Sequence, residues 1–201
     1  MVQRFINRMM LDGKKAVAEL RARGWIHRRG VQYHWTNRGF ATFDDYLESL
    51  RSKRRNQVRR ERREVAAAGI DVQAVPGTDV PDEVFGQLFE LYRRTVDRNP
   101  WGQRYVNRRF FDLVRERFRP RLSFVLARAD GRVIGGAFNV EKGDTLYGRY
   151  WAGPPDVRYL HFEVCYYAGI EHCIRRGLQR FEPGAGGEFK ALRGFEATET
   201  D

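Results

Sequence analysis

The chain has 201 residues, 42% of them hydrophobic, and a formal net charge of +11. This length suits one folded domain with a sizeable core, or one domain together with part of another. No apolar run approaches the roughly 20 residues of a membrane span, and residues 1–10 lack a signal peptide's apolar segment, so we expect no membrane span and a cytoplasmic protein. The positive charge predicts a polyanionic partner: nucleic acid, a phosphorylated substrate or a membrane surface.

The first third of the chain predicts a helix, a strand and a second helix. Residues 4–23 form a basic pattern that is typical of a helix ending at Gly24. Apolar and polar side chains alternate over residues 31–36, which indicates a half-buried strand. Thr42, followed three residues later by Asp45, is typical of a capping box at the start of a helix.

This second helix is expected to continue past residue 50 while its buried face becomes basic. The stripe at helical spacing comprises Phe43, Leu47, Leu50, Arg54, Val58, Glu61 and Val65. Between Arg51 and Glu64 there are eight basic and two acidic residues, a net charge of +6. Two interpretations remain open: a solvated or salt-bridged surface helix, or a face that binds an anionic ligand. For the second interpretation the candidate residues are Lys53, Arg54, Arg55 and Arg59.

From residue 71 the sequence predicts a strand, two helices, three consecutive strands, a long helix and a short strand. The expected elements cover residues 71–75, 81–96, 105–118, 122–128, 132–140, 145–151, 159–176 and 178–181. Pro154 and Pro155 end the strand before the long helix, because proline supplies no N–H group to a sheet. Gly177 is the expected C-terminal residue of that helix. This order predicts a mixed α/β fold.

The last strand leads into a glycine-rich loop, residues 182–190, in which five small residues or prolines separate Glu182 from Glu188. Such a backbone lets a substrate approach closely, and it can bring Glu182, Glu188, Lys190 and Arg193 around one site. The alternative interpretation is an ordinary glycine-rich turn with solvated charges.

Several runs of the sequence resemble the FemAB-like family of predicted N-acyltransferases. They are FATFDDYLESLRSKRRNQVRRERREV (40–65), YGRYW (147–151), LHFEVCYY (160–167), RFEPGAGGEFK (180–190) and RGF (193–195). The resemblance implies the fold of the acyl-CoA N-acyltransferase (GNAT) superfamily: a mixed sheet flanked by helices, here with part of a preceding lobe. The predicted order of elements agrees with that fold. The resemblance also implies peptidoglycan-related acyl or aminoacyl transfer.

Family members normally extend beyond both ends of this sequence, so the resemblance implies a fragment. Residues 1–69 are expected to form part of a first lobe that includes the basic helix. Residues 70–201 are expected to form a GNAT-like lobe that is truncated at its C-terminal end. Such a fragment would be catalytically incomplete and would expose a sheet edge.

The matching runs contain the residues to which we assign chemistry. Acyl transfer to an amine needs a base that accepts a proton and a donor that stabilises the oxyanion. The candidate catalytic residues are Glu163, Glu182, Glu188 and Lys190. The candidate substrate-binding residues are Arg149, Trp151, His161, Tyr167, Gly184, Gly186, Gly187 and Arg193. In related Fem-type transferases, a pair similar to Phe189-Lys190 lies by the substrate groove.

The expected donor is an acyl-CoA or an aminoacyl-tRNA, and no permanently bound cofactor is expected. In GNAT enzymes a basic, glycine-containing loop before the long helix usually holds the pyrophosphate of coenzyme A. Here that loop has two prolines and Arg158 as its one cation, which argues against coenzyme A, although the free amides of a helix N-terminus still favour anions.

The long helix also carries histidine and cysteine at helical spacing. His161, Cys165 and His172 share nearly one face, but no further ligand is spaced to complete a tetrahedral metal site, so no metal is expected. Two other interpretations are a base and nucleophile, formed by His161 and Cys165, and a packed histidine beside a small buried cysteine.

Three hypotheses about function follow. The first is an N-acyltransferase that joins an acyl or aminoacyl group to an amine acceptor, with charged tRNA as a candidate donor. The second is a nucleic-acid-binding module that uses the basic residues 51–64. The third is a non-catalytic remnant. The sequence does not select the donor, the acceptor or the oligomeric state.

Overall fold

The computed structural model describes residues 23–24, 30–100, 102–184 and 187–200. The chain divides into two compact units, one of residues 1–32 with 198–201 and one of Tyr33–Ala197. Apart from residues 30–32 and 198–200, which are parts of strands, the residues described below lie in the second unit. The predicted helix over residues 4–23 falls outside the described residues, and the two lobes expected to meet near residue 70 stay a prediction. Within the described residues, no helix is both long and apolar enough to cross a membrane.

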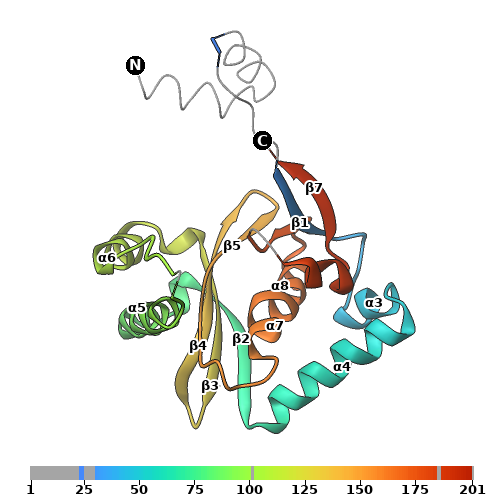
Figure 1. Cartoon of the computed structure of the whole chain (residues 1–201), viewed down its shortest axis with the longest axis horizontal. Coiled ribbons are helices and arrows are strands. Elements are labelled where there is room, and N and C mark those ends of the chain that lie inside the picture. The colour runs from blue at the N-terminus through green and yellow to red at the C-terminus, as the bar shows by residue number, and fades with distance from the viewer. Residues whose placement is uncertain (1–22, 25–29, 101, 185–186, 201) are drawn as a thin grey trace. The chain divides into compact units, whose positions relative to one another are not determined.

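A seven-stranded mixed sheet runs through the fold (Figure 1), which confirms the predicted α/β class. In spatial order its strands are β2 (Ile70–Pro76), β3 (Leu122–Ala129), β4 (Arg132–Lys142), β5 (Thr145–Ala152), β6 (Arg180–Glu182), β1 (Gly30–Thr36) and β7 (Glu196–Thr200). Neighbours from β2 to β5 pair antiparallel, and short turns join β3 to β4 and β4 to β5. The β5–β6 pair is parallel, so the chain needs a helical crossover between them.

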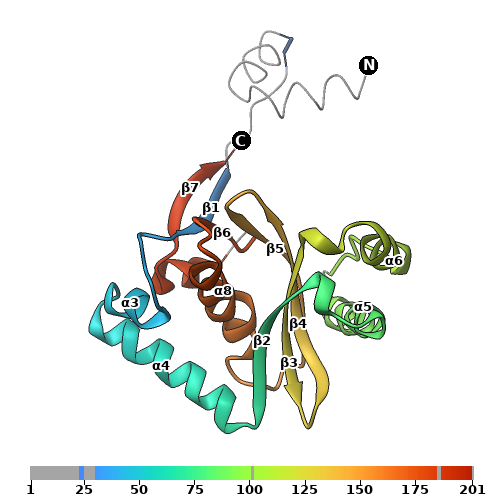
Figure 2. The ribbon, with the colours of Figure 1, turned by 180° about the vertical axis from the view of Figure 1, so that it is seen from behind.

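Helices cover both faces of the sheet (Figures 1 and 2). On one face, α5 (Asp82–Asp97) and α6 (Arg108–Arg117) pack with β3 and β4 around a phenylalanine-rich core. On the other lie α4 (Ser52–Ala67) and the crossover helix, which comprises α7 (Leu160–Phe162), a π-helical segment (Glu163–Tyr167) and α8 (Ala168–Arg176). The predicted order of strands and helices from β2 to β6 is therefore confirmed.

Local signals located several element ends correctly. The Thr42 side chain accepts a hydrogen bond from the Asp45 N–H at 3.1 Å, and Asp45 accepts one from the Thr42 N–H at 2.8 Å, so the capping box is present. Gly177 ends α8 with a φ of 66°, a left-handed conformation that glycine adopts without strain. The second helix of the α5–α6 pair begins three residues later than predicted, because the Asn107 side chain caps it by accepting from the Phe110 N–H at 3.0 Å.

Two predictions in the first third are wrong. The helix from Thr42 is not continuous: α3 (Phe43–Glu48) ends where the Ser49 hydroxyl donates to the Tyr46 carbonyl at 2.6 Å, and Arg51 is extended before α4 begins. The strand predicted over residues 31–36 is present as β1, but its half-buried alternation is wrong. Val31 is 59% exposed, whereas His34 and Trp35 are both buried, because the end of β1 is covered on both faces.

Candidate functional site

The ammonium group of Lys190 contacts the start of the glycine-rich loop. The loop follows β6, and a 3₁₀-helix (Glu188–Arg193) returns the chain beneath it. Lys190 is only 2% exposed, and its Nζ donates a hydrogen bond to the Gly184 carbonyl at 2.6 Å. Gly184 and Gly187 have φ values of 92° and 87°, so the loop needs glycine at both positions. Lys190 and Gly184 are therefore in contact, and the assignment of Lys190, Gly184 and Gly187 to a substrate site stays a prediction.

Burial sets the electrostatics of this ammonium. Burial lowers the pKa of Lys190, because the charged ammonium loses water molecules that the surrounding protein does not fully replace. The Tyr166 ring lies 5.9 Å from Nζ, within range of a cation–π interaction. A cation held in such surroundings interacts strongly with a negative charge that develops nearby.

An aromatic wall lies beside Lys190. The His161 ring contacts Trp151 at 5.4 Å, Tyr166 at 5.4 Å and Phe189 at 6.4 Å between ring centroids. Burial, followed by the charges of Lys190 and Arg193, lowers the pKa of His161 to about 4. At neutral pH this imidazole is therefore uncharged.

A cleft of about 420 Å³ lies against His161 and Trp151. His161, Phe162 and Trp151 line it together with Arg98 and the loop between β5 and α7. Because Phe162 and His161 also contact Phe189, the same two side chains join the cleft to the Lys190 loop.

The π-helical segment positions several of these groups. Its wider turn inserts a residue into the crossover helix, and such segments occur frequently at functional sites. Tyr166 points to the aromatic wall, and the neighbouring Tyr167 points to Arg193. Helical periodicity in the sequence could not distinguish this segment from a regular α-helix.

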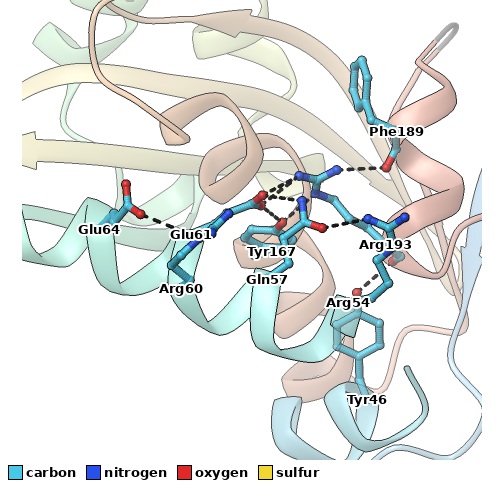
Figure 3. Close-up of polar contacts among 9 residues, drawn as sticks. All are labelled: Tyr46, Arg54, Gln57, Arg60, Glu61, Glu64, Tyr167, Phe189 and Arg193. Carbon is cyan, nitrogen blue, oxygen red and sulfur yellow. Dashed lines mark hydrogen bonds and ion pairs between the residues drawn. The ribbon is translucent and has the colours of Figure 1, made fainter. Parts of the chain in front are cut away.

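Arg193 is held in a buried network that also contains Glu61 of α4 and Tyr167 (Figure 3). Its guanidinium donates to the Glu61 carboxylate at 2.8 and 3.0 Å, to the Tyr167 hydroxyl at 2.6 Å and to the Phe189 carbonyl at 3.0 Å. It also lies 3.8 Å above the Phe162 ring. Arg193 thus fixes the backbone next to Lys190, and in this structure its donors serve protein groups instead of a substrate.

The candidate carboxylates occupy different surroundings. Glu163 is 4% exposed and accepts from Arg62 at 3.1 and 3.2 Å, and burial raises its pKa. Glu182 ends β6 at the entry to the loop, and its carboxylate lies 4.0 Å from the His34 Nε2. The side chain of Glu188 and all of Gly186 lie outside the described residues. Of the two described carboxylates, Glu182 is the one on the loop with Lys190.

The remaining candidates lie apart from this loop. Arg149 is exposed on β5, with its guanidinium 5.1 Å from the Tyr147 ring. On α4, Lys53 is exposed, Arg54 donates to Gln57 at 2.9 Å, and Arg55 and Arg59 form ion pairs with Glu48. The basic helix is thus largely salt-bridged. For the paired residues, this supports the interpretation as a salt-bridged surface helix.

Sequence reasoning did not identify Glu61, Tyr166 or His34 as neighbours of the site. A signal existed for Glu61, since a carboxylate between Val58 and Val65 on an otherwise apolar stripe requires a buried cationic partner. Nothing in the sequence identified that partner. Neither thiol offers a nucleophile, because burial raises the pKa of Cys165 and of Cys173. The described residues contain no group of three side chains spaced to hold a metal ion.

Solved structures with the same fold have very different sequences. One titled "Crystal structure of FemX" matches with a TM-score of 0.64 and 14% identity, over 93% of this chain and 68% of that one. The C-terminal domain of a putative lysylphosphatidylglycerol synthetase from Agrobacterium fabrum matches with a TM-score of 0.61 and 12% identity, over 86% and 59%. A conserved protein of unknown function from Bacteroides thetaiotaomicron matches at 0.55 and 12%, over 98% and 73%. These similarities show the fold alone.

No curated protein matches this sequence. The model of the FemAB-like family, described as acting in peptidoglycan biosynthesis or recognition, matches residues 8–201. That range is nearly the whole chain and includes the Lys190 loop, the aromatic wall and the basic helix. The chain therefore belongs to the FemAB-like family.

Proposed function

We propose that this protein transfers an acyl or aminoacyl group to an amine acceptor, and that the reacting carbonyl binds beside Lys190. The observation that carries the proposal is the buried Lys190 ammonium, which is held by the glycine-rich loop and lies next to a neutral His161. Membership of a family described as acting in peptidoglycan biosynthesis supports an acceptor amine on a peptidoglycan precursor.

The chemistry assigns one role to Lys190 and one to Glu182. The acceptor nitrogen attacks the carbonyl carbon of an activated ester or thioester, and the carbonyl oxygen becomes an oxyanion. The Lys190 ammonium stabilises that oxyanion, which is worth most where water is excluded. Glu182 accepts the proton that the attacking amine loses. Collapse of the intermediate breaks the bond to the leaving oxygen or sulfur, which takes up a proton, and an amide remains.

Among donors, the surroundings favour an aminoacyl-tRNA over acyl-CoA. The loop before α7 contains Pro154 and Pro155, which lack the N–H groups that would bind a pyrophosphate. Among the described residues, Lys53 and Arg63 of α4 are exposed and take part in no ion pair. These two cations offer a surface for the phosphate backbone of a tRNA. In this account, binding of nucleic acid is part of the transfer reaction.

A donor panel tests the proposal. The purified protein is incubated with a peptidoglycan precursor that carries a free lysine amine, and with either a charged tRNA mixture or a set of acyl-CoA thioesters. We expect mass spectrometry to detect a new amide on the precursor with charged tRNA. Absence of a product with both donor classes, from protein shown to be folded, would favour the non-catalytic hypothesis.

A further inference from the structure

The cleft that lies against His161 and Trp151 has an aromatic lining. Its aromatic side chains are Trp151, Tyr159, His161 and Phe162. The Trp151 and His161 rings meet edge to face, with 5.4 Å between their centroids. All of these side chains are half-buried, so each ring keeps an exposed part. The cleft volume of about 420 Å³ is typical of pockets that bind small molecules, and the exposed rings favour an apolar group.

The charged side chains that line this cleft are cations. Among the described residues, Arg98 and Arg158 line it, and no carboxylate does. Arg158 forms an ion pair with Glu64 at 3.6 Å, but Glu64 is not part of the lining. A cationic ligand group would therefore lose water in the cleft without gaining a negative partner, whereas an uncharged aromatic group has no such cost. The lining thus disfavours a cationic group.

The backbone of Tyr159 is strained at the wall of the cleft. Its φ of 62° is a left-handed conformation, which costs free energy for a bulky residue. The ring stacks on Phe162 with the centroids 6.4 Å apart, and the Arg158 guanidinium carbon lies 4.6 Å from the Tyr159 centroid. Strained residues of this kind cluster at ligand sites, where the surrounding contacts hold them. Tyr159 therefore supports the interpretation of the cleft as a binding site.

Aromatic side chains connect the cleft with the Lys190 ammonium. Phe189 precedes Lys190 in the chain, is 40% exposed, and has its ring centroid 5.5 Å from that of Phe162. The centroid of the Tyr166 ring lies 5.4 Å from the His161 centroid and 5.9 Å from the Lys190 Nζ. Because His161 and Phe162 line the cleft, the cleft and the surroundings of Lys190 share side chains.

We infer that this cleft binds an aromatic side chain of the transferred acyl group, so that the donor is charged with an aromatic amino acid. The inference rests on the proposed function, because it requires an aminoacyl donor whose carbonyl binds beside Lys190. A glycyl or alanyl group would leave the rings of the cleft in contact with water, and a lysyl or arginyl group would meet two cations. An aromatic group instead buries apolar surface and adds ring–ring contacts.

Calorimetric titration of the whole chain with stable donor analogues tests the inference without a transfer step. The probes are amides of 3′-amino-3′-deoxyadenosine that carry phenylalanine, glycine, lysine or glutamate. We expect the phenylalanyl amide to bind about tenfold or more tightly than the glycyl amide, as burial of one aromatic side chain allows. The lysyl and glutamyl amides should both bind more weakly than the phenylalanyl amide.

The outcomes separate this inference from the proposed function. Equal affinities, or tightest binding of any amide other than the phenylalanyl one, would overturn the inference and leave an aminoacyl donor in place. Binding of none of the amides would contradict the aminoacyl donor itself, and the inference with it.

A variant of the aromatic lining locates the site. Trp151→Leu removes one ring and should reduce the preference for the phenylalanyl over the glycyl amide by about threefold or more, as expected for a lost aromatic pair. The control Tyr105→Leu changes a ring that is 78% exposed and does not line the cleft, so it should keep the preference. Melting curves establish that both variants fold. An unchanged preference in folded Trp151→Leu, or an equal loss in Tyr105→Leu, would overturn the assignment.

Arg158→Glu tests the charge of the cleft without disturbing the core, because Arg158 is exposed. The new carboxylate should raise the affinity of the lysyl amide relative to the glycyl amide by about threefold. Arg117→Glu, the same change at an exposed arginine of α6, should leave that ratio unchanged. A ratio that stays constant in Arg158→Glu, or that rises equally in Arg117→Glu, would place the aminoacyl side chain outside this cleft.

Discussion

The Glu61 carboxylate and the Arg193 guanidinium form a buried ion pair at 2.8 Å between residues 132 positions apart. Glu61 is 1% exposed and Arg193 is 3% exposed, so water solvates neither group. The pair joins α4 to the 3₁₀-helix that carries Lys190, and the Tyr46 hydroxyl links α3 to the same 3₁₀-helix by donating to the Arg193 carbonyl at 2.8 Å. The basic helix thus helps to build the site through its one fully buried acidic residue.

Removing either partner of this pair leaves the other charge buried and uncompensated. We expect Glu61→Ala or Arg193→Ala to lower the free energy of unfolding by about 3–5 kcal/mol each. The double variant Glu61→Leu/Arg193→Leu should lose less than the sum of the single losses, because no charge is left behind. Urea unfolding of the set measures both effects. Single losses below about 1 kcal/mol would show that the pair contributes little.

His161 should remain uncharged through the physiological range. Its pKa of about 4 in the fold lies below the ordinary value of 6.5, so the unfolded chain binds more protons between these values. Stability from this group is therefore present above pH 6.5 and is lost as the pH falls toward 4, by an amount on the order of 3 kcal/mol. Proton NMR, with the signal assigned by its loss in His161→Phe, should show no titration between pH 6 and 8. A midpoint near 6.5 would contradict the burial described here.

Gly169 allows α8 to approach Phe181 of β6 closely. A Cβ at this position would lie 2.6 Å from the Phe181 ring, so Gly169→Ala should overpack the core and cost about 1–3 kcal/mol. The matched control is Gly86→Ala on α5, where the nearest atom is the flexible tip of Arg108 at 3.1 Å. Helix propensity should make that change neutral or stabilising by up to about 1 kcal/mol. Thermal unfolding that ranks the two variants in the opposite order would refute this account.

The exposed cations of α4 should bind tRNA in a salt-dependent manner. The double variant Lys53→Gln/Arg63→Gln removes two exposed charges that form no ion pair among the described residues. The slope of log affinity against log salt concentration should therefore fall in magnitude by about 0.7–0.9 per lost phosphate contact. The control Arg117→Gln/Arg121→Gln should keep the wild-type slope. Titration of labelled tRNA at several salt concentrations measures both. A slope that does not depend on the α4 cations would place any tRNA contact elsewhere.

Local signals explain why the order of elements could be predicted. The capping box at Thr42 and Asp45, the prolines after β5 and the glycine after α8 each act within a few residues, and each ends or starts an element where expected. The break between α3 and α4 was missed, because a single serine competes for a helix carbonyl without altering the apolar period.

The site was only partly predictable for a different physical reason. The composition of residues 182–190 predicted a glycine-rich loop, and the contact between Lys190 and the Gly184 carbonyl agrees with that prediction. Glu61 and Arg193 are 132 positions apart, so their pairing depends on tertiary packing. The spacing of apolar residues within one helix or strand carries no information about such a contact. The π-helical segment shifts Tyr166 and Tyr167 relative to a regular helix, and side-chain spacing alone does not reveal such a shift.

The proposed role of the Lys190 ammonium is to stabilise the oxyanion of acyl transfer. Its most direct test compares wild type, Lys190→Met and Lys190→Arg in single-turnover amide formation, with melting curves to confirm folding. Because Lys190→Met keeps the apolar stem and removes the charge, the account predicts a rate about 10²–10³ lower with donor affinity largely retained. Lys190→Arg should recover part of the rate. A wild-type rate in folded Lys190→Met would contradict the claim and would move the reaction away from the glycine-rich loop.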